Sequence, residues 1–424
     1  MSAGEARRDE PVANGIARLA EGLGREQVFA HEPRSVEGAR LEATLRPASG
    51  EALAEALRVL GEEALPALVR GGGSRLACAN APCRARVLLE TGALAFPPEI
   101  DAEEGVARVA AGSRLASLRE ALAGTGLELP LDPPGRDATL GGALAAAAVG
   151  PRFDQPRDAV LGLGVALVSG ERIRCGGRVV KNVTGYDLAK LFVGSFGTLG
   201  VIEWAWLRLR PAPEATRVCV APLGLDAEHD AAALAAARRP SVRAAALVDA
   251  KLLAEAAPGE APRWLVVELA GDAGAVAADA EALAHDHGAL HAEASVLERV
   301  REAQGEGALR VRVAALPTRL PAAALLLREA GGELLAYPAR GLLWARFPLE
   351  GPSDERGVDR ALRAATAAAA DASGARRIEE APLPARAGRE VFGGASSALA
   401  LERAVKRQFD PAGLLNPGRF VGGL

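Results

Sequence analysis

Residues 65–74 read Leu-Pro-Ala-Leu-Val-Arg-Gly-Gly-Gly-Ser, an apolar strand that runs directly into three glycines. Glycine has no Cβ, so the backbone from Arg70 to Ser74 can adopt positive φ angles and turn several N–H groups toward one ligand. This geometry binds anions, and phosphate is its natural guest. The pattern matches neither GxGxxG nor GxxxxGK[ST], which argues against an ordinary Rossmann or P-loop site. A flexible surface turn is the alternative.

Regular secondary structure is predicted on both sides of this turn. Residues 52–60 have the apolar spacing of an amphipathic helix, and 65–69, 86–90 and 105–110 are predicted strands. A further helix is predicted over 115–122. Two strands within 161–174 are joined at Ser169-Gly170, which has the chemistry of a hairpin turn.

A second pair of glycines stands at the start of a helix. Thr139-Leu-Gly-Gly142 follows a loop and opens an alanine-rich helix predicted over 143–148. Unpaired N–H groups and the positive end of the helix dipole favour an anion there. A capped helix packed tightly on a sheet is the alternative. Two glycine loops in one domain are more informative than either alone, because a diphosphate needs donors from more than one side.

A third glycine-rich stretch, Gly194-Ser-Phe-Gly-Thr-Leu-Gly200, precedes a strand predicted over 201–209. A strand entered through such a loop could offer its first N–H and C=O groups to a flat ring.

The segment just upstream, Lys181-Asn-Val-Thr-Gly-Tyr-Asp187, contains one of the chain's two tyrosines. Tyr186 could donate a hydrogen bond or stack on a ring, and Lys181 could stabilise a developing negative charge. Asp187 is predicted to cap a helix over 188–193. A purely structural role, with Asp187 as a cap and Tyr186 packed, is equally compatible with the pattern.

Composition excludes several classes of protein. The 424 residues carry 50 Lys+Arg and 54 Asp+Glu, and a pI near 5.9 gives no basic surface for a nucleic acid. No apolar stretch approaches the roughly 20 residues that span a bilayer, and residues 1–11 lack the apolar core of a signal peptide. We therefore expect a cytoplasmic protein. The four scattered cysteines are expected to be free, buried thiols, with neither disulfides nor an iron–sulfur cluster.

The chain changes character after Pro211-Ala212-Pro213. Short β-rich runs then alternate with alanine-rich helices as far as about residue 372, without any of the candidate motifs, which predicts a separate α+β cap. His285, His287 and His291 crowd together in this segment. Spacings of two on a helix point side chains in different directions, so we expect a solvated face and no metal site. The last fifty residues are predicted to be mostly loop, ending in Leu415-Asn-Pro-Gly-Arg419.

Taken in order, RGGGS, DATLGG, VVKNVTGYDLAKLFVGSFGTLGVI and LNPGR resemble the vanillyl-alcohol-oxidase family of FAD-binding proteins, also called the PCMH type. Within that family the string GPRF…RDAVLG…GGRVVKNVTGYD is most similar to the small FAD-binding subunit of bacterial glycolate oxidase. The resemblance implies an α+β fold with a two-lobed PCMH-type FAD-binding domain and a separate α+β cap domain. The implied boundaries are 35–211 for the FAD domain, 212–375 for the cap and 376–424 for a C-terminal segment that returns to the FAD domain.

The resemblance also implies which residues hold FAD. Family members that attach the flavin covalently use a histidine in the first glycine loop, where this chain has Gly72 and Gly73, so FAD is expected to be non-covalent. The implied cofactor contacts are Arg70, Gly71, Gly72, Gly73, Ser74, Gly135, Arg136, Thr139, Gly141, Gly142, Asp158, Gly197, Gly200, Val201 and Ile202.

The implied function is that of an FAD-binding subunit of a glycolate (2-hydroxy acid) oxidase complex, with Tyr186 and Lys181 as candidate catalytic residues. Electrons would pass through the flavin to an iron–sulfur partner, and the implied partners are that subunit and a larger flavin subunit. Any membrane contact, at the inner membrane, would be indirect. Related enzymes that oxidise 2-hydroxy acids carry a GDGN-x-H string, which this chain lacks. A stand-alone FAD-dependent dehydrogenase of another alcohol or hydroxy acid, and a non-catalytic relay or assembly subunit, therefore stay open.

Overall fold

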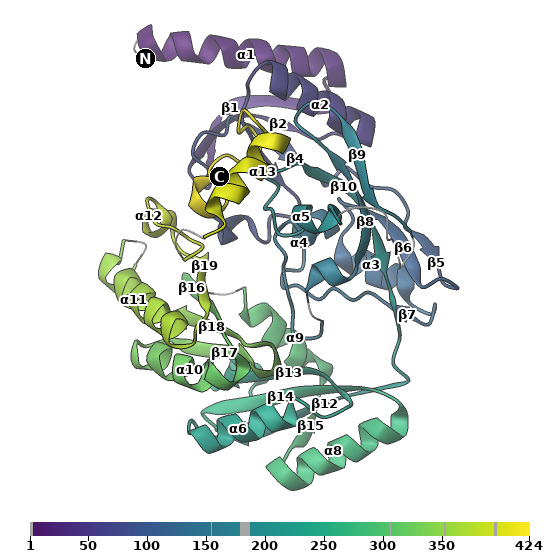
Figure 1. Cartoon of the computed structure of the whole chain (residues 1–424), viewed down its shortest axis with the longest axis vertical. Coiled ribbons are helices and arrows are strands. Elements are labelled where there is room, and N and C mark those ends of the chain that lie inside the picture. Colours follow the sequence, from purple (N-terminus) through teal and green to yellow (C-terminus); the bar gives the residue numbers. More distant parts are fainter. Residues whose placement is uncertain (1–2, 154, 179–186, 306, 352, 394–396) are drawn as a thin grey trace.

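The computed structural model describes residues 3–153, 155–178, 187–305, 307–351, 353–393 and 397–424. The chain forms two parts, an N-terminal lobe built on two sheets and a cap domain built on one large sheet (Figure 1). In the view of Figure 1 the N-terminal lobe lies above the cap. The candidate site lies in the N-terminal lobe, on the side where the C-terminal segment comes back to it.

The first sheet of the N-terminal lobe has the strand order β1-β2-β4-β3, and β4 runs parallel to both of its neighbours. Helix α2 begins after the N-cap Ser49, whose hydroxyl accepts from the N–H of Ala52. Its leucines Leu53, Leu57 and Leu60 are fully buried, and burying each one stabilises the fold by about 1.5–3 kcal/mol. The elements are α1 (Ala3–Leu23), β1 (Val28–Val36), β2 (Ala39–Leu45), α2 (Gly50–Glu62), β3 (Ala67–Arg70) and β4 (Val87–Glu90).

The second sheet is antiparallel throughout, in the order β5-β6-β10-β8-β9. The predicted hairpin at Ser169-Gly170 is confirmed, because it joins β8 to β9. Helices α3 and α4 pack on this sheet through one apolar cluster. The elements are β5 (Glu99–Asp101), β6 (Val106–Ala110), α3 (Leu115–Leu122), α4 (Leu140–Ala145), β8 (Val160–Ala166), β9 (Arg172–Gly176), α5 (Ala189–Phe192) and β10 (Val201–Arg208), and a short pair, β7 (Leu127–Glu128) with β11 (Arg210–Pro211), lies apart.

The cap domain has an eight-stranded antiparallel sheet in the order β15-β12-β14-β13-β17-β18-β16-β19. Helices α6, α8, α10 and α11 contribute to the apolar cluster on one face, and α7 and α9 to the cluster on the other. The bounds are β12 (Ala215–Leu223), α6 (Ala227–Ala236), β13 (Val242–Asp249), α7 (Ala250–Leu253), β14 (Arg263–Gly271), α8 (Ala273–His287), β15 (Leu290–Ala292), α9 (Ala294–Ala303), β16 (Leu309–Ala314), α10 (Leu320–Glu329), β17 (Glu333–Tyr337), β18 (Leu342–Phe347), α11 (Glu355–Asp371) and β19 (Ala375–Glu380).

The C-terminal segment returns to the N-terminal lobe. Helix α13 (Leu399–Phe409) places the ring of Phe409 5.4 Å from that of Phe192 in α5, and Leu415 forms a parallel bridge with Ala67 of β3. In Figure 1 this yellow helix lies beside strands from the first half of the chain. The last fifty residues combine loop, as predicted, with three regular elements, β19, α12 (Leu383–Arg386) and α13. The boundary predicted at 375 separates β19 from β16, the strand with which it pairs.

Three smaller expectations also change. Helix α4 ends at Ala145 rather than at 148, because its last carbonyls accept from the N–H groups of Gly194 and Phe196. Three cysteines are buried, as predicted, but Cys83 is exposed because it lies in the loop before β4. None of the helices in the described part of the chain is long and apolar enough to cross a membrane.

Candidate functional site

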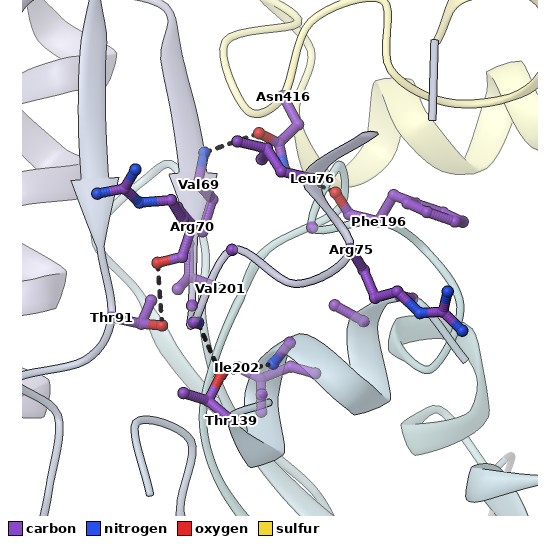
Figure 2. Close-up of a pocket in the computed structure, with 18 of the residues that line it drawn as sticks. Val69, Arg70, Arg75, Leu76, Thr91, Thr139, Phe196, Val201, Ile202 and Asn416 are labelled. Atoms are coloured by element: carbon purple, nitrogen blue, oxygen red, sulfur yellow. Dashed lines mark hydrogen bonds between the residues drawn. The ribbon is translucent and has the colours of Figure 1, made fainter. Parts of the chain in front are cut away.

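A cleft opens where strand β3 ends in the first glycine loop (Figure 2). All three glycine-rich segments predicted from the sequence contribute to its wall, and the C-terminal segment closes one side. The lining residues are Val69, Arg70, Gly71, Gly72, Gly73, Ser74, Arg75, Leu76, Thr91, Thr139, Gly141, Gly142, Ala145, Ala146, Ser195, Phe196, Gly197, Gly200, Val201, Ile202, Asn416 and Arg419.

Thr139 fastens the first two glycine loops together. Its Oγ1 accepts from the N–H of Gly142, as the N-cap of α4, and from the N–H of Gly72, both at 3.3 Å. Figure 2 shows this side chain between the two loops. The approach requires glycine, because a Cβ at Gly71 would lie 2.3 Å from Thr139 Oγ1 and one at Gly72 would lie 1.7 Å from the carbonyl oxygen of Asp137. The predicted convergence of the two loops is therefore a direct contact.

The first loop presents unpaired main-chain donors to the cleft. Within the described residues, the N–H groups of Gly73, Ser74 and Arg75 have no hydrogen-bond acceptor. Gly73 has φ +83, which turns the chain in the way that three consecutive donors on one concave surface need. Gly73 and Ser74 are exposed and Arg75 is half-buried, and successive free N–H groups on a concave surface of this kind favour an anionic ligand.

Asn416, in the LNPGR stretch, ties the C-terminal segment to the cleft. Its Oδ1 accepts from the N–H of Val69 at 2.7 Å, and its Nδ2 donates to the carbonyl of Phe196 at 2.6 Å. Its backbone is left-handed, with φ +46, a conformation that asparagine tolerates better than most residues. Arg419, three residues on, lines the same wall and donates to the carbonyl of Leu76 at 2.5 Å. Burial lowers the pKa of Arg419 to about 10, so its side chain stays charged at neutral pH.

The third glycine segment is held from behind by a buried lysine. Lys406 in α13 donates through Nζ to the carbonyl of Thr198 at 2.6 Å, to Asp410 Oδ2 at 2.6 Å and to the carbonyl of Leu415 at 3.2 Å. Its three N–H donors therefore meet three acceptors. This lysine fixes the loop that carries Gly197 and Gly200 against the C-terminal segment.

Most of the residues predicted to contact a cofactor line the cleft, and some do not. Arg70 lines it through its backbone, but its guanidinium pairs with Glu90 and is not free to add charge to a ligand. Gly135 lies behind Ser74, and its neighbour Arg136 is exposed. Asp158 is exposed near Arg157 and is not one of the residues that line the cleft.

The two predicted catalytic residues, Lys181 and Tyr186, lie outside the residues that the structure describes. The prediction that Asp187 caps the next helix is wrong. The residue before α5 is Leu188 in helical conformation without a side-chain cap, and Asp187 pairs with Lys190 at 3.0 Å instead.

Comparison with known proteins identifies the first lobe. Residues 41–176 match the model of the FAD binding domain, and residues 395–420 match that of the C-terminal domain of FAD linked oxidases. Residues 41–176 are therefore similar to FAD binding domains. Over 97% of its length the chain superposes on 96% of p-cresol methylhydroxylase with a TM-score of 0.75, at 14% sequence identity, which shows the shared fold.

Several curated proteins are similar to part of this chain, among them the following three. D-lactate dehydrogenase of Archaeoglobus fulgidus is 36% identical over 170 residues, which cover 39% of this chain and 38% of the relative. Glycolate oxidase subunit GlcD of Bacillus subtilis is 33% identical over 184 residues, 42% of this chain and 39% of the relative. Glycolate oxidase subunit GlcE of Escherichia coli is 40% identical over 121 residues, which cover 27% of this chain and 35% of the relative. The chain thus matches less than half the length of each of these relatives.

The cleft of this FAD-binding domain has the chemistry that a dinucleotide requires. The free N–H groups at 73–75 offer donors to a diphosphate. The predicted donors at the start of α4 are not free, because the N–H groups of Leu140 and Gly141 donate to the carbonyls of Ser113 and Ala111, and that of Gly142 donates to Thr139 Oγ1. The hydroxyl hydrogen of Thr139 has no acceptor among the described residues and can be given to a ligand oxygen.

A second hollow of about 250 Å³, which we call the chamber, adjoins the cleft between the FAD-binding domain and the cap. The cleft and the chamber share Ala146 and Phe196. Three phenylalanine rings stack edge-on or tilted along the chamber wall, with centroids 5.4 to 6.1 Å apart. The lining residues are Ala146, Ala147, Gly194, Phe196, Arg312, Ala314, Ala375, Arg376, Arg377, Phe392 and Phe420.

The chamber has a cationic wall from the edge of the cap sheet. Glu379 is 1% exposed and accepts from Arg377 at 2.7 and 2.8 Å, while Arg312 lies 3.2 Å and Arg75 3.9 Å from it. Burial alone would raise the pKa of Glu379, but the guanidinium groups of Arg377, Arg312 and Arg75 outweigh burial and hold this pKa far below its usual range. Three guanidinium groups thus share one carboxylate, which leaves the cluster positively charged.

Sequence reasoning missed several residues of this site. Asn416 and Arg419 belong to the LNPGR stretch, whose pattern predicts no role for either side chain. No sequence pattern indicated the arginines of the chamber, because strands of the cap bring Arg312 and Arg377 together across 65 positions, which no local pattern spans.

Proposed function

We propose that this chain is an FAD-dependent oxidoreductase that takes electrons from a 2-hydroxy acid such as glycolate. The observation that supports this most is the excess of positive charge in the chamber next to the FAD cleft. A carboxylate is the group that a guanidinium fork recognises best, and a 2-hydroxy acid carries one beside the carbon to be oxidised.

In this proposal the chain's own residues bind and orient the reactants. Bound FAD would supply the hydride-accepting ring. Thr139, Asn416 and the N–H groups at 73–75 would hold the cofactor. Arg312 would orient the carboxylate, since its Nε lies 3.2 Å from Glu379 and no described residue accepts from its two terminal nitrogens. The phenylalanine wall would exclude water from the reacting carbon. Lys181 and Tyr186 stay the candidates for handling the hydroxyl proton.

We further propose that the chain works within a complex of the glycolate oxidase type, with a larger flavin subunit and an iron–sulfur subunit. Two relatives bear the names of glycolate oxidase subunits, which supports an assembly of several chains. Electrons leaving the flavin need an onward acceptor, and the described part of this chain brings together no group of three or more His, Cys, Asp or Glu side chains that could hold a metal ion.

A second candidate function is that of an electron relay or assembly subunit that does not oxidise substrate itself. It is favoured by the chamber lining, which among the described residues contains arginine, phenylalanine, alanine and glycine but no side chain able to accept the hydroxyl proton at neutral pH.

One experiment separates the two functions. The purified chain, loaded with FAD, is mixed with glycolate or D-lactate without oxygen, and the flavin absorption near 450 nm is followed in a stopped-flow instrument. Bleaching of the flavin on the time scale of enzyme turnover supports the oxidoreductase. Arg312→Gln should then slow flavin reduction more at limiting than at saturating substrate. A flavin that stays oxidised with both acids, yet is reduced by dithionite, refutes substrate oxidation by this chain alone and favours the relay. Acid precipitation of the same sample should leave the flavin in solution, as non-covalent binding requires.

A further inference from the structure

The cap domain holds a loop that backs the first glycine loop of the FAD cleft. This loop, residues 132–136, begins at Asp132, which is 3% exposed. Arg301 of cap helix α9 pairs with the Asp132 carboxylate at 3.1 Å, and Arg152 and Arg119 of the N-terminal lobe lie 3.4 and 3.7 Å from it. Arg152 also pairs with Glu268 of cap strand β14 at 3.0 Å. One end of the loop is therefore clamped to the cap by buried ion pairs.

The other end of the loop is bonded to the next residue of the same cap helix. Glu302 Oε2 accepts from the N–H of Gly135 at 3.1 Å, and its Oε1 accepts from Arg301 Nε at 3.1 Å, which fixes the direction of the carboxylate. Gly135 has φ +99 and stands directly against the cleft, because a Cβ built on it would lie 2.6 Å from Ser74 Cβ. A continuous contact thus runs from Glu302 through Gly135 to Ser74.

Ser74 belongs to the row of free N–H groups at 73–75. The position of Gly135 therefore determines how closely loop 132–136 packs against that row. We propose that Arg301 and Glu302 are positioning residues for the cofactor, which hold loop 132–136 against Ser74 and so make FAD affinity depend on the cap. The inference rests on the proposed FAD cleft but not on the identity of the substrate.

Charge and position make opposite predictions for Glu302. A carboxylate near a bound diphosphate repels it, so a purely electrostatic role predicts that removing Glu302 tightens FAD binding. A positioning role predicts that the same change weakens binding, since Gly135 loses its acceptor and the loop can withdraw from Ser74. The sign of the effect therefore decides between the two roles.

The test measures the dissociation constant of FAD for the deflavinated full chain by quenching of flavin fluorescence. Glu302→Ala should raise the constant by about tenfold, the change that corresponds to about 1.4 kcal/mol. Glu302→Gln keeps an oxygen that can accept from Gly135 and should bind FAD as tightly as the unaltered chain or more tightly. Glu281→Ala removes an exposed carboxylate from α8 of the same cap and serves as the matched control.

Arg301→Met gives an independent measurement if Glu302→Ala does not fold, because Arg119 and Arg152 stay beside Asp132; a rise of several-fold in the constant is expected. Unchanged or tighter binding by both Glu302→Ala and Arg301→Met overturns this inference while leaving the cleft intact. If the unaltered chain does not bind FAD at all, the proposed cleft fails and the inference fails with it.

Discussion

The hydroxyl of Thr139 connects the first two glycine loops. Its removal should weaken the cleft strongly while hardly changing the shape of the side chain. Replacing Thr139 by valine keeps the branched outline and removes Oγ1 alone. Two N–H donors, those of Gly142 and Gly72, then lose their acceptor. The N-cap is worth about 1 kcal/mol and the second hydrogen bond about 0.5–1.5 kcal/mol, so the N-terminal lobe should lose about 2 kcal/mol of unfolding free energy.

The assay combines thermal unfolding with FAD titration. A loss of about 2 kcal/mol should lower the midpoint by roughly 4–8 °C in a lobe of this size. FAD affinity should fall by about tenfold or more, because the two glycine loops are no longer fastened and one donor to the ligand is gone. Thr139→Ser keeps the hydroxyl and is the control, with affinity near that of the unaltered chain. Equal midpoints and equal affinities for the valine and serine variants would refute the idea that Thr139 joins the loops.

Three further changes probe the parts of the structure around the cleft. Asn416→Asp keeps the acceptor for Val69 but sets an anion against the carbonyl of Phe196, so FAD affinity should drop about tenfold in the same titration; unchanged affinity would contradict this role. Glu379→Gln should make the unfolding free energy fall less as the pH is lowered from 6 to 3. The folded-state pKa of Glu379 is depressed, so its carboxylate contributes stability above its ordinary pKa of 4.5 and loses that contribution as the pH falls further. An equal fall for both chains, measured by urea unfolding, would count against the ion cluster. Lys406→Met leaves Asp410 buried without its cation and should cost about 3–5 kcal/mol in urea unfolding, whereas a cost below 1 kcal/mol would show that the pair is dispensable.

Local patterns predicted the elements around the cleft well. The amphipathic spacing over 52–60 lies within α2, the helix predicted over 115–122 is α3, and the strands predicted at 86–90 and 105–110 are β4 and β6 with bounds shifted by one residue. These elements follow from short-range periodicity and turn chemistry, which a sequence shows directly. The resemblance to FAD-binding proteins placed the glycine loops together, and the structure supplies the reason in the hydrogen bonds of Thr139.

What the sequence could not show depends on contacts between distant positions. Asn416 bonds to the N–H of Val69 across 347 positions, and Glu302 reaches Gly135 across 167. The failed cap at Asp187 has a local cause, because its carboxylate pairs with Lys190 at 3.0 Å and no side chain caps the start of α5. The middle of the cap was only partly predicted, because strands such as β13 and β17 are rich in alanine and leucine and have no alternation of polar and apolar residues.

The late position of Asn416 has a consequence for biosynthesis. During translation the three glycine segments emerge long before the residue that bridges β3 to Phe196, so a nascent chain can assemble both sheets of the N-terminal lobe while its pocket still lacks one wall. Stable capture of the nucleotide must then wait until residues 414–419 have been made and docked. Ribosome-bound chains halted before that point should remain colourless, and a frameshift that replaces residues 414–424 should abolish flavin content although both sheets of the N-terminal lobe are intact.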